Sequence, residues 1–218
     1  MRRTAKSLTT KPRKVPRQPR SEMTVSALLE AAAQVLERAG LQGFNTNEVA
    51  RRAGVSIGSL YQYFPGKDAI LLALMRREKE LFYNDARGAL DKPNGLEAMS
   101  FLIEAAVRQQ LLRPNLALLL DQEESRPPLR DDARAISHFS GLLLQVVSRP
   151  DLPSQADYRL AAKDVGAIVS GMIDAAGERH ETDMPALERR VKAAVFGYLQ
   201  HAAVAATEVS PIQRESEI

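Results

Sequence analysis

The chain has 218 residues, of which 44% are hydrophobic and 26% charged, and its formal net charge is +3. This length and composition suffice to bury one large core or two small ones. The absence of cysteine excludes disulfides, thiolate metal sites and a cysteine redox switch. No apolar run is long enough to cross a bilayer, and none follows the basic start of the chain as in a secretory signal. We therefore expect a soluble, cytoplasmic protein with no membrane partner.

Positive charge is concentrated at the start of the chain. Residues 1–20 hold eight basic side chains and no acidic one, so the rest of the chain carries −5 (+3 minus +8). Pro12, Pro16 and Pro19 oppose a helix in this segment. We predict a basic, disordered arm over residues 1–20, which either binds phosphates electrostatically or serves only as a solubilising tail.

Apolar residues recur at helical spacing along most of the remaining chain. The spacing predicts four consecutive helices, over residues 24–39, 46–53, 56–63 and 67–87. Gly40 and Gly54 are expected to end the first two helices, and Thr46 and Ser56 to be the N-caps of the next two. Proline and glycine predict further helix breaks near residues 92–95, 113–114, 126–128, 149–153 and 182–185. Because alternating apolar patterns are nearly absent, we predict an all-α fold of about nine helices.

The second and third predicted helices are short and joined by a tight turn, which is the shape of a helix-turn-helix. Gly54 can supply the positive φ that such a turn needs. On a helical wheel, Leu60 and Phe64 face the core. Gly58, Ser59 and Gln62 lie on the opposite face, with Tyr61 and Tyr63 on its flanks. A face of small, hydroxyl and amide side chains suits the major groove of DNA.

The run from residue 46 to residue 67 resembles the signature of the tetracycline-repressor (TetR) family. The matching features are Thr46, the Val49-Ala50 pair, Ala53-Gly54-Val55-Ser56, Gly58, Leu60-Tyr61, Phe64 and Lys67. The resemblance covers about residues 24–75, and the rest matches only in length and helical character. It implies a ligand-released repressor that acts as a homodimer on a palindromic operator in double-stranded DNA. A transcriptional activator and an architectural DNA-binding protein of low sequence specificity remain alternatives.

The resemblance also implies the domain organisation. The helix-turn-helix DNA-binding domain is expected over residues 21–66, following the arm. A helical effector-binding and dimerisation domain is then expected over residues 67–208, with a flexible tail over residues 209–218.

Nine residues are candidates for DNA contact. Gln62 is the best base reader, because its amide can make a bidentate contact with adenine. The resemblance implies phosphate contacts for Thr46, Lys67 and the two tyrosines, whose rings could equally cap the core. For Ile57 the wheel indicates the rim of the core, whereas the resemblance implies exposure to DNA. The full set is Thr46, Ser56, Ile57, Gly58, Ser59, Tyr61, Gln62, Tyr63 and Lys67.

The regulatory half offers weaker patterns. The family builds its dimer from the last two long helices, expected here at about residues 154–180 and 184–206, although core packing within one chain explains the same apolar stripes. The candidate interface residues are Val169, Met172, Ile173, Val191, Val195, Tyr198 and Leu199. A pocket for an unknown, partly apolar small-molecule effector is expected between residues 75 and 150. Its candidate lining residues are Phe82, Phe101, Arg108, Gln109, Glu123, His138 and Phe139.

Catalytic and metal-binding patterns are missing from the sequence. His138, His180 and His201 are far apart and lack metal-ligand spacing, and no glycine-rich phosphate loop occurs. We therefore expect no enzymatic activity, no cofactor and no metal.

Overall fold

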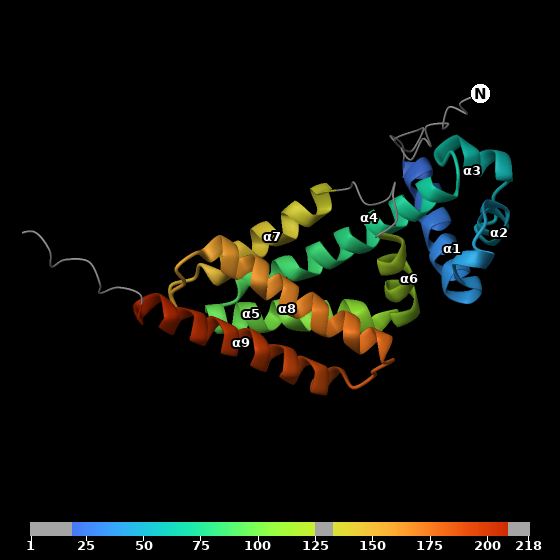
Figure 1. The fold of residues 1–218 in the computed structure, drawn as a ribbon. Helices are drawn as coiled ribbons and strands as arrows, with labels where there is room; N and C mark the ends of the chain where they lie inside the picture. Colours follow the sequence, from blue (N-terminus) through green and yellow to red (C-terminus); the bar gives the residue numbers. More distant parts are fainter. Residues whose placement is uncertain (1–18, 125–132, 209–218) are drawn as a thin grey trace, which may run out of the picture. The chain divides into compact units, whose positions relative to one another are not determined.

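The computed structural model describes residues 19–124 and 133–208 (Figure 1). These residues form nine α-helices and one short 3-10 helix, without any strand, which confirms the predicted all-α fold. None of these helices is long and apolar enough to cross a membrane. Apart from Pro19 and Arg20, which begin α1, the predicted arm lies outside the described residues. The same is true of the predicted tail over 209–218 and of the break at 126–128.

The predicted breaks within the described ranges are confirmed. Prolines at the starts of α6 and α9 suit the first turn of a helix, where an amide hydrogen has no intrahelical partner. In chain order the elements are α1 (Pro19–Gly43), α2 (Thr46–Arg52), α3 (Ile57–Tyr63), α4 (Lys67–Ala86), η1 (Arg87–Asp91), α5 (Gly95–Leu112), α6 (Pro114–Glu124), α7 (Ala133–Val147), α8 (Tyr158–Glu178) and α9 (Met184–Glu208).

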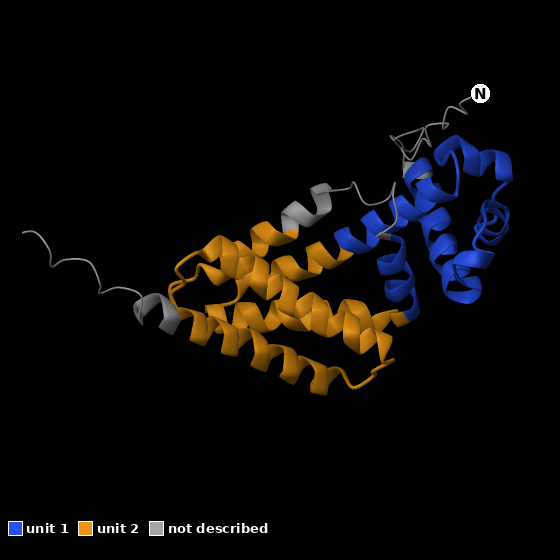
Figure 2. Cartoon of the chain, in the orientation of Figure 1, with its two compact units in different colours: residues 1–80, 115–133 blue, residues 81–114, 134–218 orange. Residues whose placement is uncertain are grey.

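The chain divides into two compact units (Figure 2). The first unit comprises residues 1–80 and 115–133, and the second comprises residues 81–114 and 134–218. The division therefore falls within α4 and not after residue 66, where we placed the boundary between domains. The reason is that Ile70 and Leu74 of α4 pack into the core of the first unit, as do Leu116 and Leu120 of α6.

The first unit holds the predicted helix-turn-helix. Its core joins apolar side chains from α1 and α2 to Leu60 and Phe64, which come from α3 and its C-cap. Gly40 has φ +61° and interrupts the helical geometry of α1, and Gly54 has φ +69° in the turn between α2 and α3. Both glycines therefore act as predicted, because positive φ is a conformation that residues with a Cβ adopt only with strain.

One predicted cap is wrong. Asn45, and not Thr46, is the N-cap of α2, since its Oδ1 accepts a hydrogen bond of 2.9 Å from the amide of Glu48. Thr46 is the first residue of the helix. The cap of α3 is confirmed, because Ser56 Oγ accepts from the amide of Ser59 at 3.1 Å.

The second unit is a bundle in which α5, α8 and α9 pack against one another. Its core includes Ile173 of α8 and Val191, Val195 and Leu199 of α9, all buried within this single chain. These four residues are candidates for the dimer interface, and core packing within one chain already accounts for their apolar stripes.

We predict that Gly54→Ala destabilises the first unit by about 1–2 kcal/mol, the strain of placing an L-residue at a left-handed φ. Gly66→Ala is the matched control, because Gly66 has an ordinary φ and nothing within 4 Å of an added Cβ. The control should leave stability unchanged or raise it slightly. Urea unfolding of both variants gives the comparison, and equal stabilities would contradict the role assigned to Gly54.

Candidate functional site

The short helix α3 presents two contrasting faces. Leu60 and Phe64 are 0% and 2% exposed, so they anchor α3 and its C-cap in the core of the first unit. Gly58 and Gln62 are exposed, and Ser59 is half-buried. This agrees with the helical wheel, and it leaves an outward face made of a small residue, a hydroxyl and an amide.

Hydroxyl groups flank this face and bond to one another. The hydroxyls of Ser56 and Ser59 lie 2.8 Å apart at the start of α3. The hydroxyl of Tyr61, a residue 41% exposed, lies 3.2 Å from Thr46 Oγ1 and so links α3 to the start of α2. Two of the predicted phosphate-contacting groups, from different helices, are therefore held side by side in an accessible position.

Ile57 and Tyr63, two of the candidates for DNA contact, differ in their surroundings. Ile57 is 37% exposed, so part of its side chain is accessible. Tyr63 is half-buried and packs against the core, which leaves less of its ring available than that of Tyr61.

Lys67 has structural partners within its own unit. Its Nζ donates a hydrogen bond of 2.9 Å to the carbonyl of Leu41 and lies 5.7 Å from the centre of the Phe44 ring. The ammonium therefore ties the first residue of α4 to the segment that follows the kink at Gly40. The resemblance implied a phosphate contact for Lys67, and the sequence did not predict its hydrogen bond to Leu41.

The predicted effector residues come together only in part. Phe82 and Phe139 are in contact, with ring centroids 4.9 Å apart, and Arg108 lies 5.8 Å from the centre of the Phe101 ring. Arg108 also forms an ion pair with Asp85 at 2.8 Å. These side chains and the half-buried Gln109 belong to the second unit, whereas Glu123 belongs to the first. The side chain of His138 lies outside the described part of the structure.

The residue that follows Gln109 along the chain, Gln110, carries a buried amide that the sequence did not predict. Gln110 is only 8% exposed, and its Nε2 has no hydrogen-bond partner within the described residues. A Cβ added to Gly177 of α8 would lie 2.9 Å from that nitrogen, so the glycine makes room for the amide. No group of three or more His, Asp or Glu side chains in the described ranges could hold a metal ion.

The remaining interface candidates have partners inside the second unit. Val169 is buried, and Met172 and Tyr198 are half-buried against the core. The hydroxyl of Tyr198 donates a hydrogen bond of 2.7 Å to Asp164, and burial together with this bond raises the pKa of Tyr198 to about 12. Three small residues of α8, Ala167, Ser170 and Gly171, are exposed near the middle of the helix.

The geometry of α2, the Gly54 turn and α3 defines a helix-turn-helix protein. Residues 28–74 match the profile described as "Bacterial regulatory proteins, tetR family". Over these residues, which include α2 and α3, the chain is similar to this family.

Two curated relatives show the extent of the likeness. The chain is 32% identical over 122 residues to the HTH-type transcriptional repressor DrrR1 of Streptomyces coeruleorubidus, covering 56% of this chain and 43% of the relative. It is 32% identical over 110 residues to the repressor KstR of Rhodococcus jostii, covering 50% of this chain and 49% of the relative. The match thus spans less than half the length of either relative.

Solved structures of similar fold can be superposed on most of the chain. The fatty acid degradation regulator FadR from Bacillus halodurans superposes with a TM-score of 0.72 at 20% identity, over 85% of this chain and 99% of its own. FadR from Bacillus subtilis, solved in complex with stearoyl-CoA, superposes with a TM-score of 0.69 at 20% identity, over 78% and 97% of the two chains.

We predict that Lys67→Met lowers the stability of the first unit by about 1 kcal/mol, because the half-buried Leu41 carbonyl loses its charged donor. Lys163→Met removes the same charge from an exposed position of α8 and should change stability by less than about 0.5 kcal/mol. Chemical denaturation of the two variants measures the difference. If both behave alike, the tether from Lys67 to Leu41 has no energetic importance.

Proposed function

We propose that this protein is a sequence-specific DNA-binding transcription regulator and that α3 is its recognition helix. The observation that carries the proposal is the outward face of α3, where Gly58, Ser59 and Gln62 lie opposite the buried Leu60. The absence of a Cβ at Gly58 permits close approach of the backbone to a groove wall. The exposed amide of Gln62 carries both the donor and the acceptor that adenine pairs with in the major groove.

Hydroxyl groups around α3 supply the contacts that would position it. Thr46 and Tyr61 offer two adjacent hydroxyls, and Ser56 lies at the start of the same helix. In protein–DNA complexes such groups bond phosphate oxygens and fix the register of the recognition helix without contributing sequence preference. The exposed Ile57 is placed to meet an apolar group such as a thymine methyl.

We also propose that the regulator is a repressor released by a partly apolar effector. Two relatives are named transcriptional repressors, and FadR from Bacillus subtilis, of similar fold, was solved with stearoyl-CoA. The contacting rings of Phe82 and Phe139 and the ring of Phe101 beside Arg108 offer apolar surface next to a cation. Helix α4 contributes residues to both units, so it is the continuous element through which an effector could act on α3.

The proposed regulator acts as a homodimer on a palindromic operator. Small exposed residues on α8, among them Ala167, Ser170 and Gly171, would allow a helix of a second copy to approach closely. Ile173, Val191, Val195 and Leu199 would support this surface from below, since they are buried in the core of one chain.

The central test is the change Gln62→Ala, measured on an operator that the wild-type protein selects from a pool of random duplexes. Loss of a bidentate base contact should weaken operator binding by about 1–3 kcal/mol and leave binding to random DNA nearly unchanged. Gln200→Ala, at an exposed position of α9, is the control and should bind like the wild type. Equal weakening on both DNAs would show that Gln62 does not read bases.

The dimer is tested with Gly171→Arg. Nothing lies within 4 Å of a Cβ added at Gly171, so one chain can accommodate the new side chain, whereas a closely packed second copy cannot. Sedimentation should give a dimer for the wild type and a monomer for this variant. Gly141→Arg is the control, because an added Cβ there is equally free and the position lies on α7. A dimeric Gly171→Arg protein would place the interface elsewhere.

A further inference from the structure

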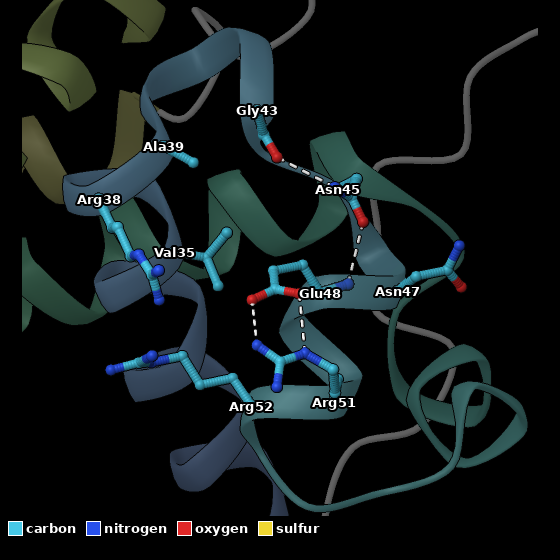
Figure 3. Close-up of a pocket in the computed structure, with 9 residues that line it drawn as sticks. All are labelled: Val35, Arg38, Ala39, Gly43, Asn45, Asn47, Glu48, Arg51 and Arg52. Atoms are coloured by element: carbon cyan, nitrogen blue, oxygen red, sulfur yellow. Dashed lines mark hydrogen bonds and ion pairs between the residues drawn. The ribbon is translucent and has the colours of Figure 1, made fainter.

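A cavity of about 380 Å³ lies in the first unit between the C-terminal part of α1 and the outer face of α2 (Figure 3). It is separate from the outward face of α3, and none of the nine candidate DNA contacts lines it. Its volume is in the range of small-molecule sites. The residues around it are Val35, Arg38, Ala39, Gly43, Asn45, Asn47, Glu48, Arg51 and Arg52.

One carboxylate and one guanidinium of this cavity neutralise each other. Arg51 donates from Nε and Nη2 to the two carboxylate oxygens of Glu48, at 2.9 and 2.6 Å. The pKa of Glu48 is lowered mainly by this hydrogen bond, and the charges of Arg51, Arg38 and Arg52 lower it further. Glu48 is therefore ionised and forms its ion pair with Arg51, so one carboxylate faces three guanidiniums and the cavity wall keeps an excess of positive charge.

The guanidiniums of Arg38 and Arg52 retain free donors. Arg52 uses Nε to donate 2.6 Å to Gln34 Oε1, a bond that holds the side chain while leaving its terminal nitrogens available. Arg38 is exposed, and its guanidinium has no hydrogen-bond partner within the described ranges. In Figure 3 the side chains of Arg38 and Arg52 approach each other from α1 and α2 on the same side of the cavity. Two like charges on one side of a cavity repel each other, and an anion between them offsets this repulsion.

We propose that this cavity binds a phosphate group, held by Arg38 and Arg52. The planar fork of a guanidinium matches pairs of phosphate oxygens, and two forks from different helices can grip one phosphate from two sides. The Glu48–Arg51 pair lines the same cavity. The phosphate is supplied either by the backbone of duplex DNA beside the bases that α3 reads, which rests on the proposed function, or by a free phosphate compound.

The test uses the full-length double variant Arg38→Gln/Arg52→Gln with two probes. The first probe is the wild-type-selected operator, on which two lost phosphate contacts should make the slope of log K against log salt shallower by about 1.8. The second probe is inorganic phosphate, titrated calorimetrically at low ionic strength, for which the double variant should bind at least about 10-fold more weakly. Arg159→Gln/Arg189→Gln removes the same charge from exposed positions of the second unit and is the control for both probes.

The outcomes separate the two sources. A shallower slope on operator and random DNA alike identifies the DNA backbone as the ligand, whereas weakened phosphate binding with an unchanged slope identifies a free phosphate compound. The proposal is overturned if the double variant matches the control variant on both probes. A wild-type protein that shows no preference for any DNA sequence but loses phosphate affinity in the double variant would refute the proposed function and leave the phosphate site standing.

Discussion

The burial of Leu60 and Phe64 is the interaction on which the proposed DNA-binding surface depends. Helix α3 has only seven residues, and isolated helices shorter than about 12 residues are marginal in water. Each of these side chains contributes roughly 1.5–3 kcal/mol when removed from water, and both are almost completely buried. The helix exists because of this anchoring, and the anchoring also fixes which face remains outside. The outward orientation of Gln62 is thus a consequence of the core.

The parts of this site that depend on local sterics were predictable from the sequence. A positive φ at Gly54 and the Ser56 cap follow from the few residue types that such positions tolerate. The error at the start of α2 has a similar origin, because Asn45 and Thr46 are adjacent and both can cap a helix. Asn45 is the cap in the structure, and its amide also donates to the carbonyl of Gly43 at 3.0 Å.

Features that depend on tertiary packing were not predictable in the same way. The periodicity of α9 correctly indicates a buried stripe at Val191, Val195 and Leu199, but it cannot say whether the same chain or a second copy covers it. The cavity beside α2 was missed for a related reason. Arg38 and Arg52 are 14 residues apart, and nothing in their spacing indicates that the kinked end of α1 lies against the outer face of α2.

The core of the first unit is built from two segments that are separate in the sequence. This limits how the unit could be transferred to another protein. Leu116 and Leu120 return to that core from α6, after the chain has built η1 and α5 in the other unit. A graft that transfers only residues 19–80 would leave the apolar side chains beneath α6 open to water, inviting aggregation. The transferable module is therefore two segments joined through their shared core. If helix-turn-helix units were recombined with different second units, α6 would be expected to coevolve with the helix-turn-helix. It shares the same core, although it lies well beyond the helix-turn-helix along the chain.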